Sequence, residues 1–571
     1  MLAGCTPWPG TLAQRYRRQG YWEDVTLGDM LNRSARDHAG KPAVVFGERR
    51  ITYRELVETS DRLAAGLSRA GLNSRERVIV HLANTPDIVF ALLALVKMGA
   101  IPVMALPSHR LTELRHLVRR SKAVGYFVPA IHREFDFRPL ADQLRAEFGQ
   151  LRHVFVAGPA NAGQHNLDDI LAAGAADGAA VPRPDPADVA LMLLSGGTTG
   201  LPKLIPRTHN DYVCNAKLSG RIGGLDHDSV FLAVLPIAHN YTLASPGILA
   251  TLFCGGTVVI APGTAAAAVL PVVEREKVTH IAAAVPLIVN WLNDPDRRRH
   301  DTSSLRVIQN GGARLAPELR RRVQQEFGCR FQEIYGTGEG LLNMTRLDDD
   351  DELVLTSSGA PVCDDDEIRV IDDAGREVPD GEAGELVCRG PYTIRGYYDD
   401  PDADAKGFTA DGFYRMGDVV RKLGRYVYTE GRKKDVINRG GEKISSEEVE
   451  NFILAHPKVE NVCIVAMPDD VYGERACAFV QPKAGQTIGF RELIDFLAGK
   501  QIAKFKLPER LELIDGFPLS PAGKILRREL RAMIERKLAA ERAERQQPAP
   551  DEPTGRRAAQ PAMAGDAAAK I

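Results

Sequence analysis

The stretch Ser195-Gly196-Gly197-Thr198-Thr199-Gly200-Leu201-Pro202-Lys203 follows an apolar run, residues 190–194, that is typical of a buried strand. Glycine lets backbone N–H groups point at an anion without a Cβ in the way, while hydroxyl groups and a lysine add donors and charge. We therefore interpret the stretch as a phosphate-binding loop. A Walker loop would end in Gly-Lys-Ser/Thr, so an ordinary P-loop NTPase is disfavoured. A plain surface loop would explain the glycine and serine content, but not the preceding strand or the Pro-Lys end.

The same pattern, a strand-like run that ends in a polar or glycine-rich loop, recurs along the chain. Residues 230–235, 305–308 and 331–334 are such runs, and residues 26–181 alternate amphipathic helices with short apolar segments. This alternation is typical of a parallel sheet with helices on its faces. Ligands of open α/β sheets bind beyond the carboxyl ends of the strands, so we expect these loops to form one site.

The length of 571 residues exceeds what one hydrophobic core supports, so at least two domains are expected. After about residue 385 the strands become shorter, and a charged segment near residue 433 precedes a new αβ pattern. The predicted fold class is α/β, with a large N-terminal domain of mixed sheets and helices over residues 1–433 and a small α+β domain over residues 434–540. Residues 541–571 are poor in large apolar side chains, and we expect a disordered tail there.

The composition excludes several classes of protein. A formal net charge of −2 gives no general attraction to nucleic acid or to an anionic membrane, and neither is an expected partner. The eight cysteines form no CxxC pair, which disfavours a zinc site or a disulfide framework. Apolar stretches such as residues 88–95 are too short to span a bilayer, and a cytoplasmic location is the expectation.

Four further motifs follow the phosphate loop. They are Tyr335-Gly336-Thr337-Gly338-Glu339, Tyr414-Arg415-Met416-Gly417-Asp418, Gly431-Arg432-Lys433-Lys434-Asp435 and Pro521-Ala522-Gly523-Lys524. Together with that loop they resemble, from about residue 22 to residue 530, the superfamily of acyl-CoA synthetases, luciferases and peptide-synthetase adenylation domains. Several independent motifs in one order are more specific than any one of them. The resemblance implies an adenylate-forming enzyme that uses ATP and Mg²⁺ and has a mobile C-terminal domain.

The chemistry of adenylation demands that two anions, a carboxylate and the α-phosphate, be brought together, so positioning and electrostatics must supply most of the catalysis. The resemblance implies that Lys524 bridges these anions and that Glu339 holds Mg²⁺ between phosphate oxygens. Asp418 would accept hydrogen bonds from the ribose hydroxyls, and Arg432 would contact ribose or phosphate. Taken alone, the same residues would be a solvated lysine, a helix cap and turn residues.

Further nucleotide contacts and a domain movement are implied as well. Tyr335 would stack on adenine, with core packing as the competing role for its ring. Lys434 matches the hinge about which the small domain rotates between the two half-reactions. Gly440, Gly441 and Lys443 would line the thiol channel, although a β-turn explains these residues equally well. The remaining nucleotide-binding residues implied are Ser195, Gly196, Gly197, Thr198, Thr199, Gly200, Lys203, Gly311, Gly312, Ala313, Gly336 and Thr337.

The segment that begins at His239 narrows the resemblance to the aryl-acid ligases of siderophore synthesis, of the 2,3-dihydroxybenzoate-AMP ligase type. By this resemblance Asn240 contacts the ring hydroxyl beside the carboxylate, Tyr241 packs on the ring, Ser245 meets a second hydroxyl, and His239 gates the carboxylate as a catalytic residue. Ser245 favours the dihydroxy acid, because salicylate-activating relatives tend to have cysteine there. Leu342 stands where dihydroxybenzoate enzymes commonly have valine, which favours the smaller salicylate.

The favoured function is activation of 2,3-dihydroxybenzoate to its adenylate, then transfer to the phosphopantetheine thiol of an aryl carrier protein of a nonribosomal peptide synthetase system. A salicylate-AMP ligase and a benzoate-type aryl-CoA ligase are the nearest alternatives. A nucleotide-binding protein without catalysis is the alternative of another class. Lys524, Glu339 and Asp418 together disfavour it, because binding alone does not need a lysine aimed at the reacting carboxylate.

Overall fold

The computed structural model describes residues 1–174, 181–195, 202–433, 435–440, 442–500, 502–520 and 524–546, with only the backbone for Lys443 and residues 543–546. Of the predicted site, Gly196, Gly197, Thr198, Thr199, Gly200, Lys434 and Gly441 lie outside the described residues. The predicted boundary at 433/434 is therefore untested at its own position.

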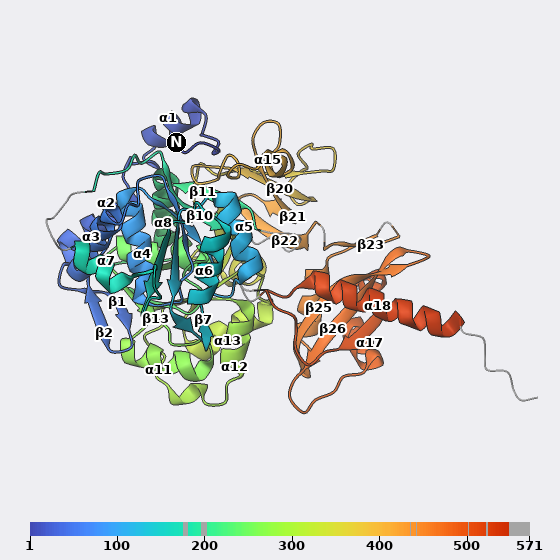
Figure 1. Cartoon of the computed structure of the whole chain (residues 1–571). Helices are drawn as coiled ribbons and strands as arrows, with labels where there is room; N and C mark the ends of the chain where they lie inside the picture. The colour runs from blue at the N-terminus through green and yellow to red at the C-terminus, as the bar shows by residue number, and fades with distance from the viewer. Residues whose placement is uncertain are drawn as a thin grey trace, which may run out of the picture.

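The large domain contains two large sheets with helices around them (Figure 1). The strands of sheet A follow the order β18-β17-β16-β15-β14-β12-β13-β1-β2. Its middle strands are parallel, and antiparallel strands close each edge. The strands are β1 (Pro42–Phe46), β2 (Arg49–Thr52), β12 (Val230–Ala233), β13 (Thr257–Ile260), β14 (His280–Ala283), β15 (Val307–Gly311), β16 (Arg330–Thr337), β17 (Gly340–Met344) and β18 (Ala360–Pro361).

Sheet B lies beside sheet A, in the order β11-β10-β4-β3-β5-β8-β9, and is parallel except for its edge strand β11. The predicted βαβ alternation over residues 26–181 is therefore confirmed. The strands are β3 (Arg77–Val80), β4 (Ile101–Met104), β5 (Gly125–Pro129), β8 (His153–Ala157), β9 (His165–Asn166), β10 (Val189–Leu194) and β11 (Leu204–Thr208), and β6 (Ile131–His132) pairs with β7 (Phe135–Asp136) nearby.

Helices fill the space between the two sheets and cover their outer faces. Alternate residues of one strand show this arrangement: Val78 and Val80 belong to the core between the sheets, whereas Ile79 belongs to the core under α5 and α6. The helices of this domain are α1 (Gly10–Arg18), α2 (Leu27–His38), α3 (Tyr53–Arg69), α4 (Pro86–Met98), α5 (Leu111–Ser121), α6 (Arg138–Glu147), α7 (Leu167–Gly174), α8 (His209–Ile222), α9 (Asn240–Ala244), α10 (Gly247–Phe253), α11 (Ala266–Glu276), α12 (Val285–Asn293), α13 (Pro317–Phe327), α14 (Asp351–Thr356) and α15 (Pro401–Gly407), with the 3₁₀ turn η1 (Arg297–Arg299).

Helix α4 illustrates why the sequence folds in this way. Pro86 occupies its first turn, and Gly99 ends it at φ +74°, a left-handed conformation that glycine adopts without strain. Nearly every residue between them is apolar and buried, as expected for a helix enclosed on all sides.

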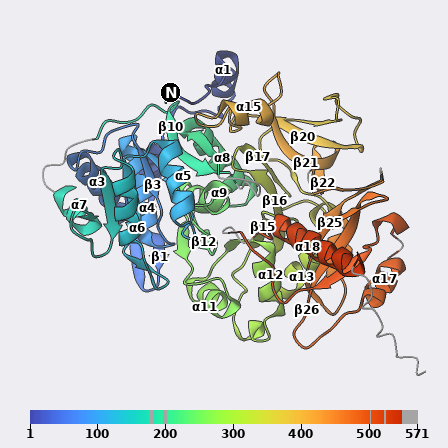
Figure 2. The same cartoon turned by 45° about the vertical axis from the view of Figure 1, so that its right-hand side comes forward.

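An antiparallel sheet follows sheet A in the chain, in the order β19-β20-β21-β22. It consists of β19 (Glu367–Ile371), β20 (Ala383–Arg389), β21 (Tyr414–Leu423) and β22 (Tyr426–Arg432). The small domain comes next and lies beside the large one (Figure 2). It contains β23 (Ile437–Arg439), β24 (Glu442–Ile444), β25 (Val459–Asp469), β26 (Gly473–Pro482), β27 (Arg510–Leu513), α16 (Ser446–Leu454), α17 (Phe490–Gly499), η2 (Lys504–Lys506) and α18 (Arg527–Gln546).

Two expectations about local structure are wrong. The predicted tail from residue 541 is still helical at its start, because α18 continues to Gln546 and Glu541 pairs with Arg510 at 2.5 Å. Tyr335, Gly336 and Thr337 were expected in a loop, but they form the end of β16, where antiparallel pairing with β17 extends the strand. The predicted α/β fold with a small α+β domain is otherwise confirmed.

Asp366 is a buried carboxyl group in the core next to sheet A. It accepts a hydrogen bond from the Tyr392 hydroxyl, and burial raises its pKa to about 8. The stability that this raised pKa provides is fully present below the unfolded value of 3.8 and is lost as the pH rises towards 8.

Asp366→Asn removes this titration. We expect its unfolding free energy, relative to wild type, to rise between pH 4 and pH 8 by at most about 1.4 kcal/mol per pH unit. Thermal unfolding across this range measures the difference. A difference that does not depend on pH would show that Asp366 is already ionised in the folded protein.

Candidate active site

The end of β16 meets the antiparallel sheet β19–β22 at the carboxylate of Asp418. The Tyr335 hydroxyl donates to Oδ2 of Asp418 at 2.7 Å, and Nε of Arg432 donates to Oδ1 at 2.8 Å. Asp418 and Arg432 face each other because they are paired in register on β21 and β22. Asp418 is 5% exposed whereas the Arg432 side chain is 46% exposed, so the pair lies at the wall of an accessible surface.

Asp418 keeps a capacity to bind a ligand despite these two contacts. Each carboxylate oxygen has a second lone pair, which can accept from a ribose hydroxyl. Burial raises the pKa of Asp418, and the Arg432 guanidinium acts in the opposite direction. The hydroxyl bond of Tyr335 was not predicted, and it orients the carboxylate from the side of β16.

Lys524 of the small domain reaches this site. A Cβ added to Gly312 would lie 3.3 Å from Cε of Lys524, so the lysine side chain crosses directly over this glycine. Burial and the Arg432 charge lower the pKa of Lys524, while Asp418 and Glu339 raise it. The structure therefore brings together Lys524, Gly312, Asp418, Arg432 and Glu339, as the motifs predicted.

The docking of the small domain explains how Lys524 arrives there. The Ser445 hydroxyl, which also caps α16, donates to the backbone oxygen of Glu430 on β22. The Lys524 backbone is itself held by Ser520, whose Oγ accepts from the Lys524 N–H at 3.0 Å. Gly440, predicted to approach the site only after the small domain rotates, lies against Tyr472 within the small domain in this arrangement.

The described ends of the phosphate loop are tied together. The Lys203 backbone N–H donates to Oγ of Ser195 at 2.9 Å, and the Ser195 N–H donates to the Lys203 oxygen at 3.0 Å. These bonds continue the antiparallel ladder of β10 and β11 beyond Leu194 and Leu204. Gly312, Ala313 and Gly336 are exposed at the neighbouring strand ends, although the strand residues before them are buried.

Glu339 follows the end of β16 and is 6% exposed. The Tyr397 hydroxyl donates to its Oε1 at 2.8 Å, and its backbone oxygen accepts from the Ile394 N–H at 2.7 Å. The Lys203 ammonium lies 4.0 Å from the centroid of the Tyr397 ring. Tyr397 was not among the predicted site residues, because nothing in the sequence shows that the segment after Gly390 folds back onto Glu339.

Arg207 supports the loop that carries Glu339. Its side chain is fully buried and forms an ion pair with Asp211 at 2.7 Å. It also donates to the backbone oxygens of Gly338, at 2.9 Å, and Tyr392, at 3.1 Å. Sequence reasoning missed it, since an arginine before a helix is ordinarily a surface residue.

The predicted acid-binding residues lie on α9 and its flanks. Nδ1 of His239 accepts the Tyr241 N–H at 3.3 Å, and burial together with the Lys524 charge lowers the pKa of His239 to about 4. His239 is therefore neutral at pH 7 and presents Nε2–H as a donor. The Tyr241 ring is packed against Gly311, where an added Cβ would lie 2.8 Å from Cζ.

A hydrogen-bonded chain joins α9 to α8. The Tyr212 hydroxyl donates to Oδ1 of Asn240 at 2.9 Å, and Nδ2 of Asn240 donates to Oγ of Ser245 at 3.3 Å. Asn215 donates to the same Oγ at 3.3 Å. Ser245 is 2% exposed, so its hydroxyl is part of a buried polar cluster. Leu342 is paired with Gly336 across the β16–β17 ladder, and its Cδ1 would lie 3.1 Å from a Cβ added there.

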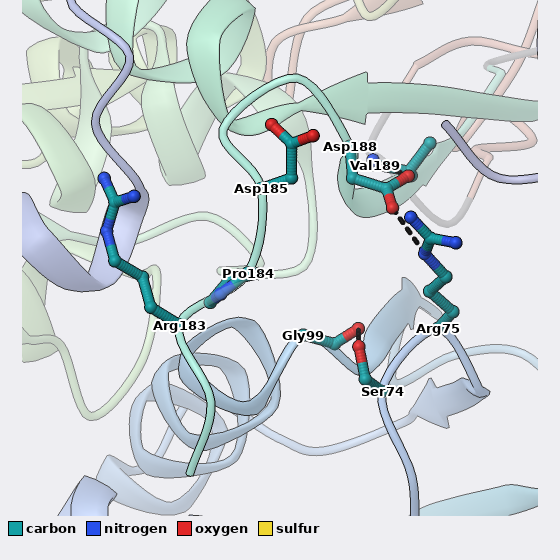
Figure 3. Close-up of a pocket in the computed structure, with 8 residues that line it drawn as sticks. All are labelled: Ser74, Arg75, Gly99, Arg183, Pro184, Asp185, Asp188 and Val189. Carbon is teal, nitrogen blue, oxygen red and sulfur yellow. Dashed lines mark hydrogen bonds and ion pairs between the residues drawn. The ribbon is translucent and has the colours of Figure 1, made fainter.

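A hollow of about 370 Å³ opens elsewhere, at residues of the α4 and β10 ends (Figure 3). Both arginines that line it are already paired, Arg75 with Asp188 at 2.6 Å and Arg183 with Asp29 at 2.8 Å. None of the predicted site residues lines it.

Among the described residues, no helix is long and apolar enough to cross a membrane, and no group of three or more His, Cys, Asp or Glu side chains could hold a metal ion.

The motifs, the fold and this geometry agree with the comparisons to known proteins. Residues 31–398 match the family described as AMP-binding enzyme, and residues 448–524 match the family described as AMP-binding enzyme C-terminal domain. The chain belongs to the AMP-binding enzyme family, and its predicted resemblance to the adenylate-forming superfamily is confirmed.

Individual relatives cover nearly the whole chain. It is 45% identical over 542 residues to a 2,3-dihydroxybenzoate-AMP ligase of Bacillus subtilis (strain 168), with 95% of this chain and 99% of the relative covered. It is 44% identical over 541 residues to a salicylyl-CoA synthase / salicylate adenylyltransferase of Streptomyces sp, with 93% of this chain and 98% of the relative covered. The crystal structure of the anthranilate CoA ligase AuaEII in complex with anthranoyl-AMP is similar with a TM-score of 0.84 at 25% identity, covering 91% and 98%.

Proposed function

We propose that this enzyme activates 2,3-dihydroxybenzoate with ATP to the aryl adenylate and transfers the aryl group to the phosphopantetheine thiol of an aryl carrier protein in siderophore biosynthesis. The observation that supports the proposal is the position of Lys524 over Gly312, near enough to Asp418 and Arg432 to interact with their charges. A cation at this position would neutralise charge on the attacking carboxylate and on the α-phosphate. The names of relatives that activate hydroxybenzoates support the substrate class.

Mg²⁺ fits the donor set around Glu339. A single buried carboxylate suits an ion that takes most of its ligands from phosphates and water. When bound, the ion would neutralise the phosphate oxygens as pyrophosphate leaves. Ser195 and Lys203 would bind the phosphates, and Asp418 with Arg432 would bind the ribose. The adenosine side of the site would be formed by Tyr335, Gly311, Gly312, Ala313, Gly336 and Thr337.

The acid would lie between α9 and the end of β16. His239, kept neutral by burial, would donate Nε2–H to the carboxylate without pairing with it as a cation, which leaves Lys524 as the charge that bridges the two reactants. Asn240 would contact the ring hydroxyl beside the carboxylate, Tyr241 would pack on the ring, and Ser245 would meet the second hydroxyl. For thiol transfer, rotation about Lys434 would withdraw Lys524 and bring Gly440, Gly441 and Lys443 to the site.

The experiment is pyrophosphate exchange across a panel of benzoic acids. We expect 2,3-dihydroxybenzoate to exceed salicylate in kcat/KM by about tenfold, because the buried Ser245 hydroxyl can bond a second ring hydroxyl. Salicylate is the second candidate, favoured by the bulk of Leu342 and by the salicylate-activating relative. A clear preference for salicylate would reverse the substrate assignment, and a panel in which no aryl acid supports exchange would remove it.

A further inference from the structure

We propose that Tyr397 is a positioning residue that presents the carboxylate of Glu339 and the ammonium of Lys203 to the triphosphate of ATP while keeping the two charges apart. The inference rests on the proposed function, in which Glu339 holds Mg²⁺ and Lys203 binds phosphate. Tyr397 would act through these two residues rather than on the reacting atoms.

The contacts of Tyr397 differ at its edge and at its face. Its hydroxyl donates to Oε1 of Glu339 at 2.8 Å, and the Lys203 ammonium lies over its ring, 4.0 Å from the centroid. An aromatic face attracts a cation, and a phenolic hydroxyl is a donor to a carboxylate. One rigid side chain therefore holds both members of the predicted phosphate and metal machinery.

Tyr397 is itself held firmly. Its side chain is 2% exposed, its backbone N–H donates to Oδ1 of Asp404 at 2.7 Å, and the Tyr414 hydroxyl is hydrogen-bonded to its own. These contacts fix the orientation of the phenol, whose hydroxyl donates to Glu339. This bond orients the Glu339 carboxylate, and lone pairs remain on both of its oxygens for a ligand.

The arrangement also prevents an unproductive ion pair. The ammonium of Lys203 lies over the ring of Tyr397, and the charge of the Asp404 carboxylate acts on it as well. Without the ring, Lys203 would be free to pair with a neighbouring carboxylate such as Asp404, and less of its charge would be available to a phosphate. Holding a cation on a ring leaves it available to a phosphate, which binds it more strongly.

Two substitutions separate the two roles. Tyr397→Phe keeps the ring under Lys203 and removes only the bond to Glu339, whereas Tyr397→Leu removes both. We expect Tyr397→Phe to weaken Mn²⁺ binding to the enzyme–ATP complex, measured by electron paramagnetic resonance, by about 10- to 100-fold, the loss expected for one hydrogen bond to a charged group. ATP binding without metal should remain within about twofold of wild type. Tyr397→Leu should weaken both.

Rescue by metal distinguishes positioning from a general loss of structure. In Tyr397→Phe the half-saturating Mg²⁺ concentration for pyrophosphate exchange should rise, while exchange at saturating Mg²⁺ returns to near the wild-type rate. Tyr398→Phe is the matched control, because Tyr398 packs in the separate core of sheet B under α5 and α6 and should leave the Mg²⁺ requirement unchanged. Melting temperatures establish that the variants are folded.

The outcomes separate this inference from the proposed function. If wild type binds no Mn²⁺ with ATP, the assignment of Glu339 fails; if wild type binds it and Tyr397→Phe binds it equally well, only the role of Tyr397 is overturned. Should the Tyr397 variants not fold, Lys203→Met tests the same point. Lys203→Met is expected to weaken ATP binding and to leave the half-saturating Mg²⁺ concentration unchanged, because the bond from Tyr397 to Glu339 does not involve Lys203. A rise in the half-saturating Mg²⁺ concentration would contradict the role of Tyr397 in positioning Glu339.

Discussion

Lys524→Ala is expected to lower the rate of adenylate formation by about 10²- to 10³-fold, the usual effect of removing a preorganised group that stabilises developing charge. Lys524 lies over Gly312 and close to Asp418, Arg432 and Glu339, and it is supplied by the small domain. No other lysine of that domain has these contacts among the described residues. Acid-dependent pyrophosphate exchange measures the loss.

The second half-reaction is the internal control for this variant. Thiol transfer from supplied aryl adenylate should proceed at nearly the wild-type rate, because the proposed rotation removes Lys524 from the site before the thiol attacks. Lys504→Ala, an exposed lysine of the same domain, should change neither step. An equal loss in both half-reactions of Lys524→Ala would contradict the role assigned to this lysine.

Arg207→Met is expected to have the largest effect on stability, about 3–5 kcal/mol, because it leaves the buried carboxylate of Asp211 without its partner. Asp211 also forms the capping box of α8 with Thr208, so its charge cannot leave the interior without loss of that cap. Urea denaturation followed by tryptophan fluorescence measures the change in unfolding free energy. The double variant Arg207→Met/Asp211→Asn should be less destabilised than the single one, since it removes the uncompensated charge.

The single variant Arg207→Met should also impair catalysis in the fraction of molecules that remains folded. Arg207 donates to the Gly338 oxygen, next to Glu339, and its guanidinium carbon lies 4.7 Å from the centroid of the Tyr212 ring, whose hydroxyl binds Asn240. It therefore supports both the loop of the predicted metal ligand and the wall of the predicted acid pocket. A folded single variant as stable as wild type would show that the ion pair contributes nothing net.

The class of fold could be predicted from the sequence because it depends on local patterns, and the resemblance of the motifs predicted which residues would lie close together. Apolar runs that end in glycine-rich loops mark parallel strands, and the order of the motifs identifies which loops meet. Asp418 and Arg432 were assigned from separate motifs, and the structure pairs them in register on neighbouring strands. Lys524 was assigned from Pro-x-Gly-Lys, and the docked small domain brings it to the site.

Other features depend on contacts between distant segments, which carry no local signal. Tyr397 and Arg207 are separated from Glu339 by 58 and 132 positions, and only the packed chain shows that they support its loop. The strand end at Tyr335 was expected as a loop because glycines normally interrupt strands, whereas pairing with β17 extends it. The neutral state of His239 follows from burial beside Lys524, which motif spacing does not reveal.

The central claim is that a carboxylate oxygen of a hydroxybenzoate attacks the α-phosphorus of ATP at the site where Lys524 lies. The most direct test incubates the enzyme with ATP, Mg²⁺ and 2,3-dihydroxybenzoate labelled with ¹⁸O in its carboxylate, then releases the aryl group with a pantetheine thiol. Mass spectrometry should find one ¹⁸O in AMP and none in pyrophosphate. Label in pyrophosphate, or AMP that carries none, would contradict the account.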